Sequence, residues 1–115
     1  MISQRHRFHG LGGLRPVYQR GRAVRGPLMS LKFVDRRPGR PYRAAVVVSK
    51  QVSPSAVMRN RIRRRLYEVV RQADPELTSE QDLVFTVFSD QLATIDSKKL
   101  EKLVRDLLTK TKSSA

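Results

Sequence analysis

The most constraining feature of this sequence is a cluster of five arginines within residues 59–65, interleaved with apolar residues at helical spacing. At 100° per residue, one side of a helix collects the apolar positions, which are Met58, Ile62, Leu66, Val69 and Ala73. The opposite side collects polar residues, which are Asn60, Arg61, Arg64, Glu68 and Arg71. Arg59 and Arg63 flank one edge of the apolar stripe, and Arg65 flanks the other. The segment predicts a helix that packs on a sheet by one side and presents guanidinium groups on its remaining surface.

The ends of this helix are predicted from its flanking residues. Ser53 is a suitable N-cap, Pro54 suits the first helical position, and Val52 can pack against Val57 as a hydrophobic staple. The helix is expected to end near Ala73, because a proline at position 75 excludes the helical region for the residue before it.

Three segments have the pattern of strands. Residues 28–34 alternate, with Met29, Leu31 and Phe33 on one face and Ser30 and Lys32 on the other. Residues 42–49 form a continuous apolar run, typical of a central strand, and the Pro-Gly turn before them predicts an antiparallel pair with 28–34. Residues 82–88 predict a third strand. Since a helix separates it from 42–49, these two strands are expected to be parallel.

Two further helices complete the prediction. Leu14, Val17 and Tyr18 share one face of a short helix over 14–19 that Gly21 ends. Asp96 caps a final helix with an apolar stripe of Leu100, Leu103, Val104, Leu107 and Leu108. We expect an α+β domain with a small mixed sheet over residues 14–110, a flexible basic arm at 1–13, and a chain that frays from Thr109, leaving 111–115 as a tail.

The charge of the chain indicates a polyanionic partner. Lysine and arginine number 24 against 10 acidic residues, giving +14 and a pI of about 11.4. Residues 1–73 hold 18 basic and 2 acidic side chains, so the partner is expected to contact this part. The preference for arginine, 17 against 7 lysines, favours RNA, because a guanidinium binds phosphate at two points and stacks on bases.

Several function classes remain to be weighed on composition alone. A merely solvated face is disfavoured because only Glu68 lies among the arginines to pair with them. An enzyme with its own active site is disfavoured, since no nucleophile motif or phosphate loop is present and only Asp35 and Glu68 lie within the basic region. A membrane-surface helix lacks an aromatic anchor. Another binding module, such as a small ribosomal protein or a DNA-binding domain, fits the composition equally well.

Compartment and metal binding are constrained by absences in the sequence. There is no cysteine and no apolar run long enough to span a bilayer, so we expect a cytoplasmic protein without a membrane partner. His6 and His9 lack further ligands nearby, so no protein-held metal is expected.

A resemblance resolves part of this choice. Arg59-Asn60-Arg61 followed by Ile62-Arg63-Arg64, after Ala56-Val57 and a strand ending in Val48-Ser49-Lys50, resembles the signature of the protein subunit of bacterial ribonuclease P. The resemblance extends over about residues 14–109. It implies the element order α-β-β-β-α-β-α, a left-handed β-α-β crossover around the arginine helix, and a fold like that of the second domain of a small-subunit ribosomal protein. The additional strand is expected near residues 24–27.

The same resemblance implies a function. The RNA subunit cleaves the 5′ leader from precursor tRNA with Mg²⁺ held mainly by RNA and substrate, and the protein binds both RNAs without a catalytic residue or a required protein partner. The residues implied to bind RNA are Lys50, Arg59, Asn60, Arg61, Arg63, Arg64 and Arg65. The residues implied to line a leader cleft are Leu14, Val17, Tyr18, Ser30 and Lys32, although helical spacing alone favours a core role for the first three. Tyr67 stands where the family frequently has an arginine.

Overall fold

The computed structural model describes residues 15–35, 42–73 and 81–113 of the chain. The elements in order are α1 (Arg15–Arg20), β1 (Arg22–Arg25), β2 (Met29–Asp35), β3 (Arg43–Val47), α2 (Ala56–Ala73), β4 (Gln81–Val87), the 3-10 helix η3 (Asp90–Ala93) and α3 (Ser97–Ser113). This confirms the expected α-β-β-β-α-β-α order and the short additional strand, which is β1. The sequence patterns did not predict η3. The expected arm at 1–13, the turn at 36–41 and the Asp74-Pro75 stop lie outside the described residues.

The four strands form one mixed sheet in the order β1-β2-β4-β3. β2 runs antiparallel to both β1 and β4, and β3 runs parallel to β4, as the intervening helix α2 requires. The predicted antiparallel pairing of the strands at 28–34 and 42–49 is wrong, because β4 lies between them. The prediction that 42–49 is a central strand is also wrong, since β3 is an edge strand that buries alternate residues. The interior strands are β2 and β4, and β4 is buried almost throughout.

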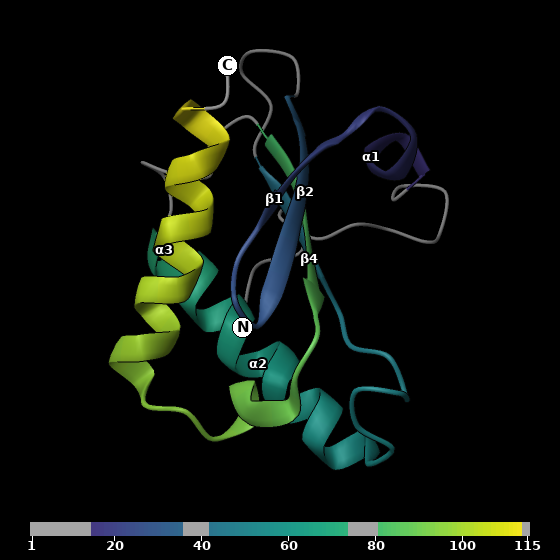
Figure 1. Cartoon of the computed structure of the whole chain (residues 1–115), viewed down its shortest axis with the longest axis vertical. Helices are drawn as coiled ribbons and strands as arrows, with labels where there is room; N and C mark the ends of the chain where they lie inside the picture. Colours follow the sequence, from purple (N-terminus) through teal and green to yellow (C-terminus); the bar gives the residue numbers. More distant parts are fainter. Residues whose placement is uncertain (1–14, 36–41, 74–80, 114–115) are drawn as a thin grey trace.

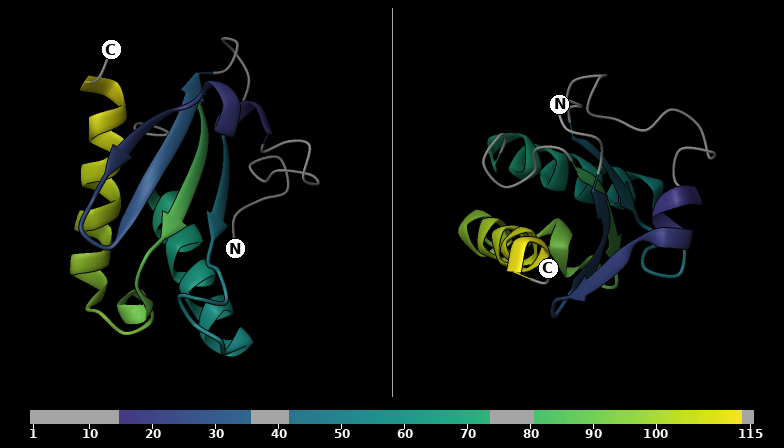
Figure 2. Two further views of the ribbon diagram at one scale, coloured as in Figure 1. Left: turned by 45° about the vertical axis from the view of Figure 1, so that its right-hand side comes forward. Right: turned by 90° about the horizontal axis from the view of Figure 1, so that it is seen from above.

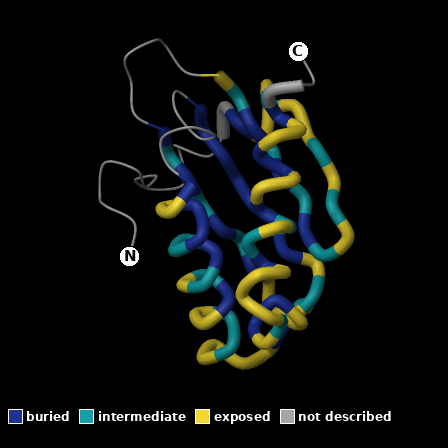
Figure 3. The backbone as a smooth tube through the Cα atoms, turned by 90° about the vertical axis from the view of Figure 1, so that its left-hand side faces the viewer, coloured by how far each residue is buried: buried dark blue, intermediate teal, exposed yellow. Residues whose placement is uncertain are grey.

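Helices cover the two faces of the sheet unequally, as Figures 1 and 2 show. α2 and α3 pack on one face and enclose the main core, whereas the short α1 lies on the other. Buried residues gather in the strands and along the sides of the helices that face them (Figure 3). Met29, Leu31 and Phe33 of β2 belong to this core, together with Ile62 and Leu66 of α2, which confirms the predicted faces of both segments.

α2 begins later than its flanking residues predict. Its N-cap is Ser55, whose hydroxyl accepts a hydrogen bond from the Met58 amide at 3.3 Å and whose carbonyl accepts from the Arg59 amide at 3.0 Å. Ser53 lies buried in the preceding turn instead, and its amide donates to the Ser49 carbonyl. The predicted Val52–Val57 staple is wrong as well, because Val57 is 76 % exposed. The predicted end at Ala73 is confirmed.

A close backbone contact sets the path from α1 to β1. The Gly21 amide donates to the Val17 carbonyl at 2.8 Å, which ends α1 as predicted. A Cβ at position 21 would lie 2.2 Å from the Val17 oxygen, so only glycine fits without a backbone shift. This contact turns the chain directly from α1 into β1.

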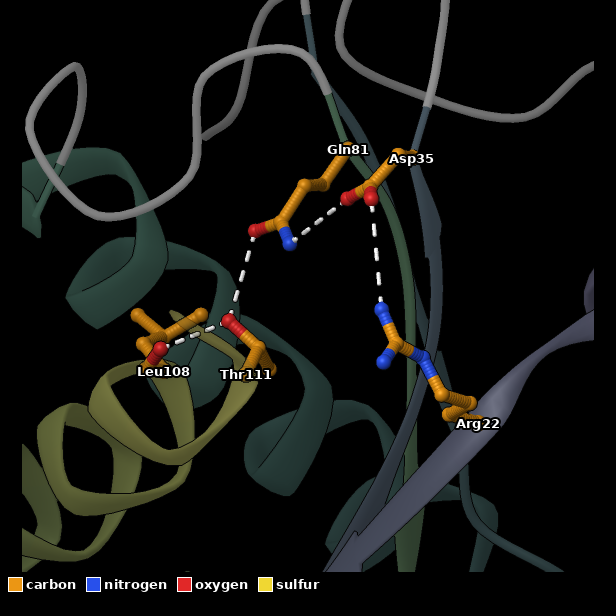
Figure 4. A network of polar contacts seen from close by, with 5 residues as sticks. All are labelled: Arg22, Asp35, Gln81, Leu108 and Thr111. Carbon is orange, nitrogen blue, oxygen red and sulfur yellow. Dashed lines mark hydrogen bonds and ion pairs between the residues drawn. The ribbon is translucent and has the colours of Figure 1, made fainter. Parts of the chain in front are cut away.

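The C-terminal turns of α3 are held by a polar network, which Figure 4 shows. The Thr111 hydroxyl donates to the Leu108 carbonyl at 2.7 Å and lies 3.4 Å from Gln81 Oε1. Gln81 Nε2 in turn donates to Asp35 Oδ1 at 3.3 Å. The prediction that the chain frays from Thr109 is therefore wrong, because Thr111 is buried and α3 continues to Ser113. The Asp96 cap is confirmed by a 3.0 Å bond from the Lys98 amide to Oδ2.

Candidate nucleic-acid interface

The solvent side of α2 carries cations that the fold itself does not use. Arg61 and Arg64 are exposed, and neither forms a hydrogen bond or ion pair with any other described residue. Both point away from the buried stripe of Ile62 and Leu66, as the helical spacing predicts. Their guanidinium groups are available to an anionic partner.

The single carboxylate on α2 does not compete for these two arginines. Glu68 accepts from Arg71 Nη2 at 2.5 Å and from its Nε at 3.2 Å. This hydrogen bond lowers the pKa of Glu68 and raises the pKa of Arg71, so both stay charged and paired with one another. The first three turns of α2 therefore keep an uncompensated positive surface.

The other arginines of the cluster serve the fold in part. Arg59 Nη1 donates to the Ser53 carbonyl at 2.8 Å and braces the turn before α2. Arg65 donates to two carbonyls, those of Leu92 at 2.8 Å and Ile95 at 2.5 Å. Arg65, expected among the RNA ligands, thus joins α2 to η3 and the loop after it. Its position on the flank of the apolar stripe is what brings it to that loop.

A shallow depression of about 260 Å³ lies beside the exposed arginines and is lined by Asn60, Arg63, Arg64 and Tyr67. Asn60 Oδ1 accepts from Arg63 Nη1 at 2.6 Å, which orients the guanidinium along the helix. The Tyr67 hydroxyl accepts from the Val46 amide at 3.2 Å and satisfies a backbone donor of the edge strand β3. Tyr67 therefore has a structural role besides lining the depression.

Lys50 lies exposed in the turn that joins β3 to α2. The turn is closed by bonds from the Val52 and Ser53 amides to the Ser49 carbonyl at 3.1 and 3.3 Å. Lys50 therefore lies at the end of the sheet where β3 leads into α2, which is also where the arginine helix begins.

A second candidate surface is the face of the sheet on which α1 lies. Lys32 Nζ stands 5.2 Å from the centroid of the Tyr18 ring, and Tyr18 is 44 % exposed. Ser30, two residues along β2, is half-buried on the same face. Lys32 therefore lies beside the Tyr18 ring, and Ser30 lies on the same face of β2.

The other two residues expected in that cleft are Val17 and Leu14. Val17 is 0 % exposed and packs between α1 and the sheet, so its side chain acts as core, the role that helical spacing alone favours. Leu14 lies outside the described residues.

Sequence reasoning missed two residues at the far end of this face. Arg25 at the end of β1 places its guanidinium carbon 4.9 Å from the centroid of the Phe88 ring, and Phe88 is 42 % exposed. In the sequence, Phe88 reads as the last member of an apolar strand. The alternation of side chains along a strand could have distinguished Phe88 from its buried neighbours, because Phe85 and Val87 are buried and Thr86 between them is not.

The described residues also bear on metal sites and membrane spans. No three side chains of histidine, aspartate or glutamate come together within ranges 15–35, 42–73 and 81–113. No helix in the described part of the chain combines the length and apolar character needed to cross a bilayer.

Comparisons with known proteins agree on one family. The family model "Ribonuclease P" matches residues 3–112. A ribonuclease P protein component from Chloroflexus aurantiacus is 37 % identical over 94 residues, covering 82 % of this chain and 68 % of the relative. One from a Synechococcus strain is 32 % identical over 113 residues, covering 96 % and 84 %.

Solved structures share the fold. The ribonuclease P protein of Staphylococcus aureus superposes with a TM-score of 0.79 at 17 % identity, covering 93 % of this chain and 95 % of that one. The protein from Thermotoga maritima gives 0.73 at 20 % identity, covering 84 % and 93 %.

Proposed function

Because this chain belongs to the ribonuclease P protein family, it is a protein component of ribonuclease P, and we propose that it acts there by binding RNA. This membership decides among the binding modules that composition alone leaves open. In this proposal the bond cleavage belongs to the RNA subunit, and the protein supplies positive charge and a shaped surface.

The observation that carries the proposal is the pair of exposed arginines on α2. Arg61 and Arg64 lie one turn apart on the outer side of a helix whose inner side is anchored in the core. A rigid helix that holds two unpaired guanidinium groups at fixed spacing suits the phosphates of a folded RNA, since each fork can bind one phosphate at two points. Asn60, Arg63 and Lys50 extend this surface, and we propose the RNA subunit as its partner.

The open sheet face beside α1 is proposed to receive the single-stranded 5′ leader of precursor tRNA. Tyr18 offers an exposed ring, Lys32 a cation and Ser30 a hydroxyl on one side of β2. Aromatic rings that bases can stack on, next to cations for the backbone, are the usual elements of single-strand binding. The two surfaces divide the work, with α2 for the RNA subunit and the sheet face for the leader.

Magnesium enters the proposal through the RNA. We propose that Mg²⁺ is held by the RNA subunit and the substrate, and that the protein lowers the Mg²⁺ requirement because bound arginines reduce phosphate repulsion. No step of the cleavage is assigned to a side chain of this chain.

A reconstitution tests the function directly. Purified protein is combined with a bacterial ribonuclease P RNA and precursor tRNA across a Mg²⁺ titration, with RNA alone and protein alone as controls. We expect cleavage at the mature 5′ end at Mg²⁺ concentrations where the RNA alone is inactive, and none with protein alone. Cleavage by the protein that survives RNase treatment and repurification would overturn the non-catalytic role.

A further inference from the structure

We propose that Arg25 and Phe88 form a second base-stacking site for single-stranded RNA, at the opposite end of the sheet face from Tyr18. The inference rests on the proposed function, because it extends the path of the leader across the open face. It assigns a contact to two residues that neither the sequence patterns nor the family resemblance singled out.

The two exposed aromatic rings of the described residues share one environment. Tyr18 and Phe88 are 44 % and 42 % exposed, whereas Phe33, Tyr42 and Phe85 are buried. Each of the two exposed rings has a cation over it, Lys32 at 5.2 Å and Arg25 at 4.9 Å. An exposed ring with a stacked cation combines a planar surface with charge for the backbone, which is the chemistry that single-stranded nucleic acid requires.

The register of the sheet places both pairs on the same face. Lys32 is paired with Val84 and Ser30 with Thr86, and the Phe88 amide continues this ladder by donating to the Leu28 carbonyl at 2.9 Å. Thr86, Ser30 and Lys32 therefore point to the face opposite to the core, and the Phe88 ring, just after β4, lies against Arg25. Arg25 is paired with Ser30 and projects to that face as well.

The spacing between the two pairs suits a short run of nucleotides. Leu28, whose carbonyl accepts from the Phe88 amide, precedes Lys32 by four residues, which is about 13 Å at about 3.3 Å per residue of extended chain. Stacked bases rise by about 3.4 Å, so about four nucleotides span the gap, and an extended strand needs fewer. Between the pairs lie the hydroxyl residues Ser30 and Thr86, which can donate to phosphate or sugar oxygens.

The position of Phe88 links the two proposed RNA surfaces. Since β3 and β4 are parallel, the C-terminal end of β4 lies at the end of the sheet where β3 turns into α2, as Figure 1 shows. A strand that leaves Tyr18 and crosses the face toward Phe88 therefore runs toward the end of the molecule that carries Lys50 and the start of the arginine helix.

A simpler role for the pair is that Arg25 merely shields an apolar ring from water. That role needs no planar cation, whereas a base-stacking site uses the guanidinium plane and the ring together. The two roles therefore differ in their response to substitutions that keep size or charge and remove planarity.

The test measures binding of the assembled holoenzyme to precursor tRNAs whose leaders lengthen one nucleotide at a time. Phe88→Leu keeps an apolar side chain and removes the ring, Arg25→Lys keeps the charge and removes the planar group, and Tyr18→Ala reports on the first site. Arg105→Gln, an exposed charge on α3 behind the other face of the sheet, is the control for lost positive charge. Melting curves are recorded for every variant.

We expect Phe88→Leu to weaken binding by about 5-fold or more once the leader reaches the second site, at unchanged melting temperature and with no effect on mature tRNA. The leader length at which this loss begins should differ from that of Tyr18→Ala by up to about four nucleotides. Arg25→Lys should follow Phe88→Leu, and Arg105→Gln should match the parent protein.

Two outcomes overturn the proposal and are distinguishable. If Tyr18→Ala loses leader-dependent affinity while Phe88→Leu follows the parent at every length, the second site is absent and the proposed leader cleft stands. If the parent itself shows no gain of affinity with leader length, the leader-binding function fails, and this inference fails with it.

Discussion

Arg43 and Asp82 lie directly opposite one another on the parallel strands β3 and β4 and form a two-point ion pair. Arg43 Nε donates to Oδ1 at 3.0 Å and Nη2 to Oδ2 at 2.8 Å. The hydrogen bond to Asp82 raises the pKa of Arg43, and the Asp82 side chain is only 6 % exposed. This pair joins the edge strand β3 to its neighbour β4, so the Arg43 guanidinium serves the fold.

Asp82→Asn is expected to lower the free energy of unfolding by about 2 kcal/mol, because it removes the carboxylate that pairs at two points with the half-buried Arg43 guanidinium. The value is below that of a fully buried pair, since Arg43 keeps some contact with water. Urea unfolding followed by circular dichroism measures it. Asp106→Asn, an exposed carboxylate on α3, is the control, and an equal effect of the two substitutions would contradict a structural role for the pair.

Arg65→Ala is expected to destabilise the protein by about 1.5 to 3 kcal/mol, because it removes the charged donor shared by the Leu92 and Ile95 carbonyls. Affinity for the RNA subunit at a temperature well below unfolding, and its dependence on salt, should change little. A reduced salt slope at unchanged melting temperature would instead assign Arg65 to RNA.

Arg61→Ala and Arg64→Ala are expected to have the opposite profile. Each should weaken binding to the RNA subunit and flatten the slope of log affinity against log salt by roughly 0.7 to 0.9 per lost phosphate contact, with an unchanged melting temperature. Filter binding across a salt series measures the slope. Ile62→Ala is the contrasting variant, because it removes a core side chain and should cost about 2 to 5 kcal/mol of stability. If both arginine variants keep the parent's slope, this side of α2 faces solvent.

Ser55→Ala is expected to cost about 1 kcal/mol, because the structure makes Ser55 the N-cap of α2. Ser55→Asp should retain the stability, since a carboxylate accepts the same amide and favours the helix N-terminus. Thermal melting of the two variants measures the cap. A large loss in Ser55→Asp would show that the hydroxyl serves another purpose.

Tyr18→Ala is expected to weaken binding of precursor tRNA to the holoenzyme by roughly 1 to 3 kcal/mol if a leader base stacks on the ring. Mature tRNA, which lacks the leader, should bind the variant and the parent alike. Tyr18→Phe, which keeps the ring, should restore most of the affinity. Equal losses for the two tRNAs together with a lower melting temperature would give Tyr18 a packing role only.

Local patterns in the sequence were sufficient for much of this structure. The helical period of α2 placed Ile62 and Leu66 inward and Arg61 and Arg64 outward, because a side chain's direction on a helix depends only on its position along the chain. The alternation of β2, the Asp96 cap and the end of α1 at Gly21 likewise depend only on residues close together in the sequence. The family could be predicted from the arginine cluster and the residues just before it.

The tertiary structure alone decided the features that depend on distant segments. An apolar run at 42–49 does not reveal that β4 enters between it and β2, because strand order is set by packing of the crossover helix on the sheet. The α3 terminus stays helical because Gln81, thirty residues earlier in the chain, stands beside Thr111. Arg65 and Arg64 are neighbours of one residue type, yet one reaches the carbonyls of a loop and the other faces water. Local sequence determined which side chains could point outward, and the contacts between segments determined which of them remained available to RNA.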